Sequence, residues 1–185
     1  GFGIEMDLRI CADEIYISHD NVCGKESDKI YLFSEFLSKV YKNNINLLAL
    51  NIKEDGISKK LKKLISKSGI QNYFVFDMSM PEKIIYIKNG LKVWQRISEY
   101  ESYSLSDLYI EEGKWVDLYD AKNFDNLITN ITSSKTDLAF VSPELHGNNH
   151  LDLWEKLKDY NDLFQGRLMI CTDYPNEAKK YFKGV

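Results

Sequence analysis

The alternation of strand-like and helix-like segments along the whole chain constrains its fold more than any other feature. Residues 47–52 form a near-continuous apolar run, as expected for a strand that is covered on both faces. Residues 57–68 are amphipathic, with Leu61, Leu64 and Ile65 on one face of a helix and lysines on the other. Strands that alternate with helices predict an α/β fold with a parallel sheet.

The predicted elements follow one another without a break. After the strand at residues 3–10 the chain returns in a strand at residues 15–18. The turn between these two strands is too short for a parallel crossover, so they form an antiparallel hairpin. The other predicted strands are residues 47–52, 73–76, 91–97, 115–119, 137–141 and 168–171. The predicted helices are residues 28–41, capped by Ser27 or Asp28, and residues 57–68, 81–89, 123–131, 150–160 and 175–182, with a polar loop at residues 98–112.

Polar side chains gather where each predicted strand ends. A ring of polar residues at every carboxyl end is typical of a closed barrel, whereas an open doubly wound sheet concentrates them at one switch point. The sequence therefore predicts a (β/α)8 TIM barrel that lacks its first strand. A length of 185 residues suits one domain, which we expect to span residues 1–185 and to be incomplete at its N-terminus.

The first hairpin carries the residues most suited to chemistry. Glu5 and Asp7 share one side of a strand because strand side chains alternate, and Met6 and Leu8 take the other side. Two carboxylates at this spacing suit a hard divalent cation such as Mg²⁺ or Ca²⁺. His19, on the return strand, could donate or accept a proton near neutral pH. The alternative is an edge hairpin whose polar side chains simply face water.

Composition excludes some classes of partner. The net charge of −4 provides no broad basic surface, which argues against nucleic-acid binding. No apolar run approaches the ~20 residues that span a bilayer. Cys11, Cys23 and Cys171 are scattered and make no disulfide framework, so we expect buried free thiols and a cytoplasmic location. The sequence does not indicate an oligomeric state.

Three segments resemble a known family. Residues 3–9, residues 15–20 and residues 170–175 look like the signature of the glycerophosphodiester phosphodiesterases. That family belongs to the TIM barrels similar to phosphatidylinositol phospholipase C. Its members bind a divalent metal through a Glu-x-Asp pair and a later Glu-x-Lys motif. They use two histidines for acid/base chemistry, one in a His-Arg-Gly motif and one in a His-Asp motif.

The resemblance implies roles for five residues. Glu5 and Asp7 match the metal pair, and His19 matches the second histidine. Asn51 and Lys53 stand where the Glu-x-Lys motif is expected, so an uncharged amide replaces the third carboxylate. An amide oxygen can ligate the metal, but metal affinity should fall or be lost. The His-Arg-Gly strand has no counterpart in the chain, and we expect it upstream of residue 1.

Four further assignments each have two interpretations. Lys53 could place a positive charge near a phosphate, or it could pair with Glu5 or Asp7. Arg96 could bind the same phosphate through two hydrogen bonds, or form a surface ion pair. Glu144 and His146 lie in a loop that could contact substrate, or that simply precedes the next helix.

Two functional hypotheses follow. The first is metal-dependent hydrolysis of a small glycerol- or sugar-linked phosphodiester, with His19 as the acid/base residue. The second is a barrel that binds a phosphorylated ligand without hydrolysing it. Both predict a small-molecule ligand.

Overall fold

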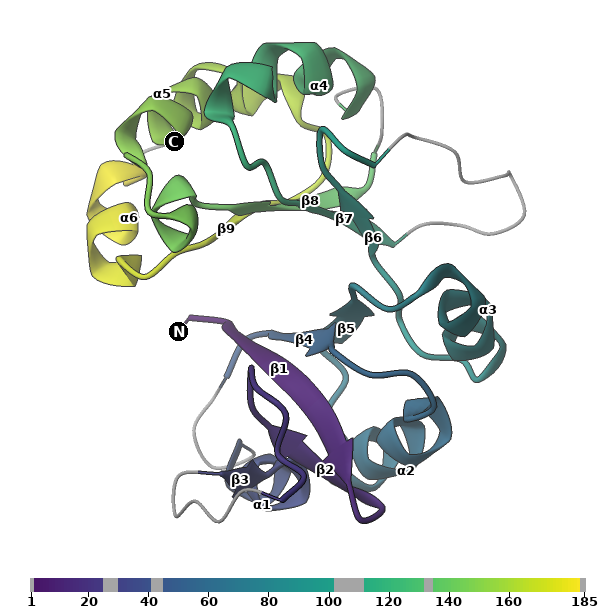
Figure 1. Ribbon diagram of the computed structural model, residues 1–185. Coiled ribbons are helices and arrows are strands. Elements are labelled where there is room, and N and C mark those ends of the chain that lie inside the picture. The colour runs from purple at the N-terminus through teal and green to yellow at the C-terminus, as the bar shows by residue number, and fades with distance from the viewer. Residues whose placement is uncertain (1, 25–29, 41–44, 102–111, 132–134, 184–185) are drawn as a thin grey trace. The chain divides into compact units, whose positions relative to one another are not determined.

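The computed structural model describes residues 2–24, 30–40, 45–101, 112–131 and 135–183. It divides the chain into two compact units, Gly1–Val93 and Trp94–Val185 (Figure 1). Each unit consists of a sheet, a set of helices and an apolar core of its own. The predicted α/β class is therefore confirmed.

The first unit contains a mixed sheet with the strand order β3-β2-β1-β4-β5. Pairing is antiparallel between β1, β2 and β3, and parallel between β1, β4 and β5. The predicted hairpin at the start of the chain is thus confirmed. The strands are β1 (Ile4–Cys11), β2 (Glu14–Ile17), β3 (Tyr31–Leu32), β4 (Leu48–Ile52) and β5 (Tyr73–Phe76).

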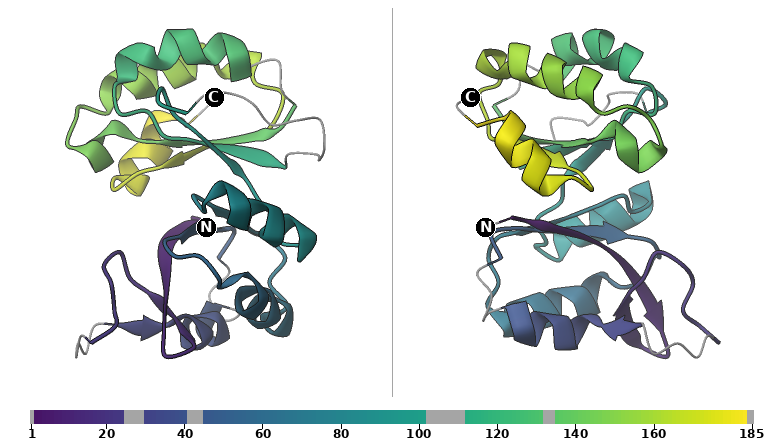
Figure 2. Two further views of the ribbon diagram at one scale, coloured as in Figure 1. Left: turned by 45° about the vertical axis from the view of Figure 1, so that its right-hand side comes forward. Right: turned by 90° about the vertical axis from the view of Figure 1, so that its left-hand side faces the viewer.

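Three helices accompany this sheet (Figure 2). Buried apolar side chains from all three form one core with the strands. Met6 and Leu8 of β1 are buried in that core, so Glu5 and Asp7 project from the opposite face. Burial of each large apolar side chain contributes about 1.5–3 kcal/mol, and this determines which face of β1 points to the core. The helices are α1 (Phe33–Val40), α2 (Ser58–Ser68) and α3 (Met80–Lys88).

The second unit contains a four-stranded, wholly parallel sheet with the strands in chain order. Its strands are β6 (Gln95–Ile97), β7 (Gly113–Val116), β8 (Asp137–Val141) and β9 (Leu168–Cys171). Helices α4 and α5 cover one face of this sheet (Figure 1). Buried side chains of both helices and of the strands, Phe124 and Phe140 among them, form one core. The helical segments are η1 (Ala121–Asn123), α4 (Phe124–Ile131), η2 (Pro143–His146), α5 (Leu151–Asp159), η3 (Asn161–Leu163) and α6 (Pro175–Tyr181).

Several predicted boundaries were wrong. Helix α1 begins at Phe33 rather than at residue 28, because Tyr31–Leu32 pairs with β2. Strand β6 is shorter than residues 91–97, and β7 starts at Gly113 rather than at residue 115. A side chain at position 113 would collide with the Trp94 ring, which explains a glycine there. The predicted caps at residues 27 and 28, and most of the predicted loop (residues 102–111), lie outside the described residues.

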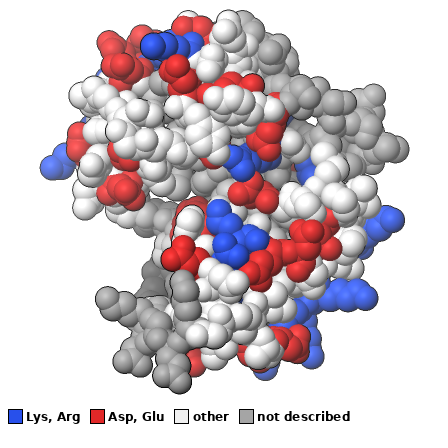
Figure 3. Space-filling view, viewed as in Figure 1, with Lys and Arg blue, Asp and Glu red and all other residues white. Residues whose placement is uncertain are grey.

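Seven described strands belong to parallel pairs, as the sequence predicted, but they lie in two sheets. A closed TIM barrel and a single domain therefore remain predictions. Within the described part of the chain, no helix is long and apolar enough to cross a bilayer. On the face shown in Figure 3, lysine and arginine side chains are interspersed with acidic ones.

Candidate functional site

The register of β1 and β4 brings an acidic and an amide side chain together. Asp7 pairs with Asn51 across this parallel pair, and Glu5 pairs with Ala49 one step earlier. Paired residues point to the same face of a sheet, so the Glu5, Asp7 and Asn51 side chains share one side. The structure thus brings together the three residues that the family resemblance assigns to the metal.

Lys53 lies directly beyond β4, where its backbone amide donates to the Leu8 carbonyl at 3.1 Å. Its Nζ lies 3.3 Å from a carboxylate oxygen of Asp7 and 3.9 Å from one of Asp77. All three side chains are about four-fifths buried. The sequence interpretation that paired Lys53 with Asp7 therefore describes the contact that is present.

Asp77 is a member of this cluster that the sequence analysis did not select. It directly follows β5 and has a φ of 68°, which is a strained backbone conformation for a residue other than glycine. Strain of this kind occurs preferentially at functional sites. The available sequence signal was a carboxylate just after a fully buried strand.

Four other predicted site residues influence the pKa of Glu5. Burial raises the pKa of Glu5 from 4.5 to about 7, and the neighbouring Asp7 carboxylate adds to this increase. The Lys53 charge, a hydrogen bond from Asn51 and the His19 ring act in the opposite direction. The five side chains therefore lie close enough to affect one another's charge.

Glu5, Asp7 and Asn51 form the donor set that a divalent cation would meet. The Oδ1 atom of Asn51 is buried and has no hydrogen-bond partner within the described part of the chain. Burial and then the Asp7 carboxylate raise the pKa of Glu5, and a cation bound to the two carboxylates would oppose both effects. Two carboxylates and an amide oxygen suit Mg²⁺ or Ca²⁺. Among the described residues, no group of three or more His, Cys, Asp or Glu residues that could hold a metal ion occurs.

His19 lies in the loop that follows β2. Its Nδ1 lies 3.1 Å from an Asp20 carboxylate oxygen, and both side chains are more than 70% exposed. The loop is attached to β1 at two points: Ser18 donates its amide to the Asp7 carbonyl, and Arg9 donates to the His19 carbonyl. The His19 ring is thus accessible to solvent, whereas these two hydrogen bonds fix the backbone around it.

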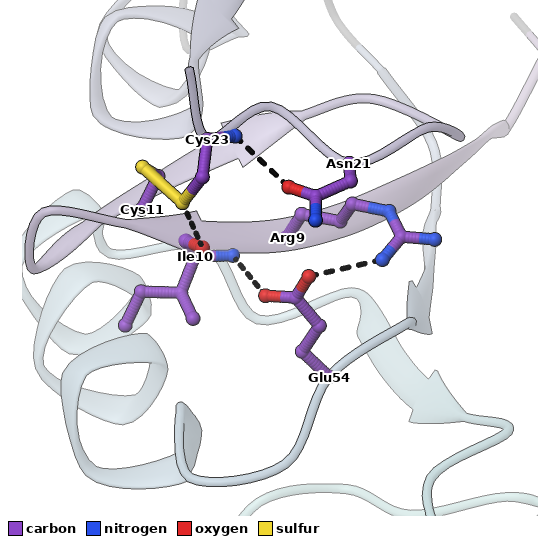
Figure 4. Close-up of a disulfide and its surroundings, with 6 residues drawn as sticks. All are labelled: Arg9, Ile10, Cys11, Asn21, Cys23 and Glu54. Carbon is purple, nitrogen blue, oxygen red and sulfur yellow. Dashed lines mark hydrogen bonds and ion pairs between the residues drawn. A yellow bond between two sulfur atoms is a disulfide. The ribbon is translucent and has the colours of Figure 1, made fainter. Parts of the chain in front are cut away.

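A disulfide between Cys11 and Cys23 closes the segment that contains His19 (Figure 4). The prediction of buried free thiols was therefore wrong for these two cysteines, and Cys171, which forms no disulfide, is only partly buried. The hairpin returns the chain to the end of β1, and that return makes the pairing possible. On the other side of β1, Glu54 accepts hydrogen bonds from Arg9 and from the Ile10 amide (Figure 4).

In the second unit, Arg96 of β6 is surrounded by acidic and phenolic groups. Its guanidinium lies 3.4 Å from Asp117 and 3.5 Å from Glu101, and it donates to the Tyr119 hydroxyl at 2.7 Å. The Arg96 side chain is 22% exposed. The ion-pair interpretation therefore describes its present contacts.

His146 ends the short helix η2, and its Nε2 lies 2.7 Å from the other Asp117 oxygen. Asp117 directly follows β7 and is the residue that joins Arg96 to His146. Sequence reasoning did not select Asp117. Its partner is 29 residues away, so no local pattern marks the pair.

Glu144 points to a different part of this unit. It accepts hydrogen bonds from the Thr172 hydroxyl and the Asp173 amide, beyond β9. Burial works to raise the pKa of Glu144, but hydrogen bonds from Ser142 and Thr172 outweigh it and hold the pKa below 4.5. Of the three predicted substrate-binding residues, Arg96 and His146 thus meet at Asp117, whereas Glu144 anchors its loop.

Comparison with known proteins identifies the class of fold. No family model and no curated protein sequence matches the chain. Among solved structures, it is similar to a glycerophosphodiester phosphodiesterase from Parabacteroides distasonis, with a TM-score of 0.66 and 14% identity over 96% of this chain and 82% of the other. It is also similar to one from Agrobacterium tumefaciens, with a TM-score of 0.65 and 10% identity over 91% and 82% of the two chains. At these identities the likeness shows the fold alone.

Proposed function

We propose that this protein hydrolyses a small glycerol- or sugar-linked phosphodiester with the help of a divalent cation. The observation that supports this most directly is the grouping of Asp7, Asn51, Lys53 and His19 around Glu5. This group stands on a fold similar to that of two glycerophosphodiester phosphodiesterases. The proposal includes the closed TIM barrel predicted from the polar strand ends.

Glu5, Asp7 and the Asn51 amide oxygen would hold the cation. When bound, a divalent cation neutralises charge on a phosphate oxygen and can orient a hydroxyl nucleophile. Lys53 contributes a fixed positive charge beside Asp7, which suits an anionic phosphate near the same carboxylates. Arg96, Glu144 and His146 remain proposed substrate-binding residues.

His19 would transfer a proton to the leaving alkoxide. Its ring is exposed to solvent, which gives a substrate access. The Asp20 carboxylate occupies Nδ1 at 3.1 Å, which leaves Nε2 as the nitrogen that can donate a proton to the leaving oxygen. General acid catalysis of this kind contributes roughly 10²–10⁴-fold to the rate.

A second function rests on Asn51. An amide contributes no charge, and Lys53 already neutralises part of the Asp7 charge. These two features favour a barrel that binds a phosphorylated ligand without hydrolysis. Measurements of cation binding and of turnover distinguish the two functions.

The cellular location is a separate part of the proposal. A cytoplasmic location was expected from free thiols, but disulfides persist mainly in oxidising compartments. The Cys11–Cys23 disulfide therefore supports an oxidising compartment over the cytoplasm.

The test is a hydrolysis assay of the full chain against a panel of small glycerol- and sugar-linked phosphodiesters, with Mg²⁺, with Ca²⁺ and with a chelator. We expect turnover that requires one of the cations and that falls at least 10²-fold in His19→Ala. Ligand binding without turnover in wild-type protein would favour the second function. Asp162→Ala, on the surface of η3, serves as the control variant.

A further inference from the structure

Strand β1 extends beyond the end of its partner β4, and a side chain continues the hydrogen bonding there. The pairing of the two strands ends at Leu8 and Ile52, and the Lys53 amide then donates to the Leu8 carbonyl. Two residues further along β1, the Ile10 amide donates to one carboxylate oxygen of Glu54 at 3.0 Å (Figure 4). Because a backbone amide holds this oxygen, the second oxygen of Glu54 has a defined position beside β1.

Arg9 lies between that carboxylate and the loop that carries His19. Its Nη1 atom donates to Glu54 at 2.9 Å, and its Nε atom donates to the His19 carbonyl oxygen at 2.8 Å. Hydrogen bonds with an ionised partner are roughly twice as strong as neutral ones. The Arg9 and Glu54 side chains are 21% and 26% exposed, so solvent screens this pair less than a fully exposed one. The guanidinium therefore attaches the backbone of His19 to β1.

The His19 ring depends on this backbone attachment. Its side chain is 78% exposed, and the Asp20 carboxylate that contacts it is 73% exposed. A general acid must lie within about 3.2 Å of the oxygen that it protonates. A misplacement of about 1 Å can cost roughly 10²-fold in rate. The hydrogen bond from Arg9 thus acts on the part of His19 that determines where its ring lies.

We propose that Arg9 and Glu54 are positioning residues for His19: Arg9 holds the His19 backbone, and Glu54 orients Arg9. The inference rests on the proposed function, in which His19 is the acid, and all three residues belong to the first unit. In that reaction the leaving oxygen keeps the electron pair of its broken bond to phosphorus and takes the His19 proton. A proton from the attacking water restores His19. Arg9 and Glu54 transfer no proton themselves.

Arginine suits this role because its planar guanidinium presents donors in two directions at once. Arg9→Gln removes the charge and shortens the side chain, so the His19 carbonyl loses its donor. Arg9→Lys keeps the charge, but its compact ammonium lacks the rigid fork that reaches both acceptors. Glu54→Gln keeps the shape of the side chain and removes the charge that orients Arg9. Neither side chain belongs to the apolar core, so we expect the three variants to fold.

The leaving group distinguishes positioning of His19 from a merely structural role. An alkoxide needs a proton as it leaves, whereas p-nitrophenolate does not. Arg9→Gln should therefore lower kcat on an alkyl phosphodiester by roughly 10–10²-fold, with a smaller change in KM. It should lower kcat on a p-nitrophenyl phosphodiester much less. Arg9→Lys and Glu54→Gln should show the same pattern with smaller losses.

Arg167→Gln is the matched control for these assays of the full chain with the activating cation. Arg167 also pairs with a carboxylate through its guanidinium, but its partner is Asp137 in the second unit. The Arg167 side chain is 70% exposed. This variant should keep the wild-type kcat on both substrates.

Two further measurements test whether Arg9 acts through His19. The double variant Arg9→Gln, His19→Ala should cleave the alkyl substrate as fast as His19→Ala alone, because residues that act as a unit are not additive. The second measurement needs no substrate. The Ser18 amide donates to the Asp7 carbonyl where the loop meets β1, and its hydrogen exchange should become severalfold faster in Arg9→Gln.

Each result supports or contradicts the inference. Equal losses on the two substrates, or a further loss in the double variant, would mean that Arg9 does not act through His19. Wild-type kcat on the alkyl substrate in Arg9→Gln, or unchanged Ser18 exchange, would also overturn the inference, while the proposed function would stand. If wild-type protein cleaves neither substrate, the proposed function and this inference both fail.

Discussion

The ammonium nitrogen of Lys53 lies 3.3 Å from a carboxylate oxygen of Asp7, and both side chains are about four-fifths buried. The pair joins a residue within β1 to one just beyond β4, and Asp77 approaches the same nitrogen from beyond β5. Three neighbouring parallel strands thus converge on one positive charge. Because Lys53 also lowers the pKa of Glu5, this charge influences the whole candidate metal site.

Replacing Lys53 should make Glu5 more difficult to ionise. Lys53→Met removes a positive charge that lowers the Glu5 pKa, so that pKa should rise above its present value of about 7. A carboxyl NMR titration of Glu5 measures the change. Lys60→Met is the control, because Lys60 pairs with Asp13 and Glu14 at the hairpin turn. An unchanged Glu5 titration in Lys53→Met would contradict the prediction.

A third carboxylate at position 51 should strengthen cation binding. Asn51→Glu adds a charged ligand next to Asp7, and we expect the Kd for Mg²⁺ or Ca²⁺ to fall roughly tenfold or more, because affinity follows ligand charge. Asn51→Gln is the matched control, since it has the same length without the charge. Isothermal titration calorimetry measures both variants. Equal affinities would mean that the site is not organised around a cation.

The raised pKa of Glu5 predicts that stability depends on pH. The folded protein holds the Glu5 proton with a pKa of about 7, whereas the unfolded chain releases it near 4.5. This contribution is fully present below about pH 4.5 and is lost as the pH rises through 7.

Glu5→Gln carries no ionisable group and should lack this loss. The free energy of unfolding of the variant relative to wild type should therefore increase between pH 5 and pH 8, by on the order of 1–3 kcal/mol. Urea unfolding at the two pH values measures the difference. Glu155→Gln, at an exposed position of α5, should show none. A constant difference between Glu5→Gln and wild type would refute the prediction.

Removal of the disulfide should destabilise the first unit. The bond joins cysteines separated by 12 positions, and closing a loop of this size contributes about 2–3 kcal/mol. The double variant Cys11→Ser, Cys23→Ser should lose about that much free energy of unfolding. It should also lose phosphodiesterase activity, because His19 lies within the closed loop. Cys171→Ser, at the cysteine that forms no disulfide, should change neither by a comparable amount.

Features that depend on neighbours in the sequence could be predicted. The alternation of side chains along β1 places Glu5 and Asp7 on one face and Met6 and Leu8 in the core, and the structure has this arrangement. The turn after β1 is too short for a parallel crossover, and its length therefore predicted the antiparallel hairpin. Each of these depends on the period of a single strand or on the length of one connection.

Only the tertiary structure revealed the pairs whose members lie on separate elements. Cys11 and Cys23 pair because the hairpin returns the chain to the end of β1, and neighbouring residues give no sign of it. Asp117 and His146 meet because β7 and β8 are adjacent in one parallel sheet, so the segments that follow these two strands emerge at the same edge. Sequence pattern determines which residues face one side of an element. Strand order and register decide which side chains meet across elements.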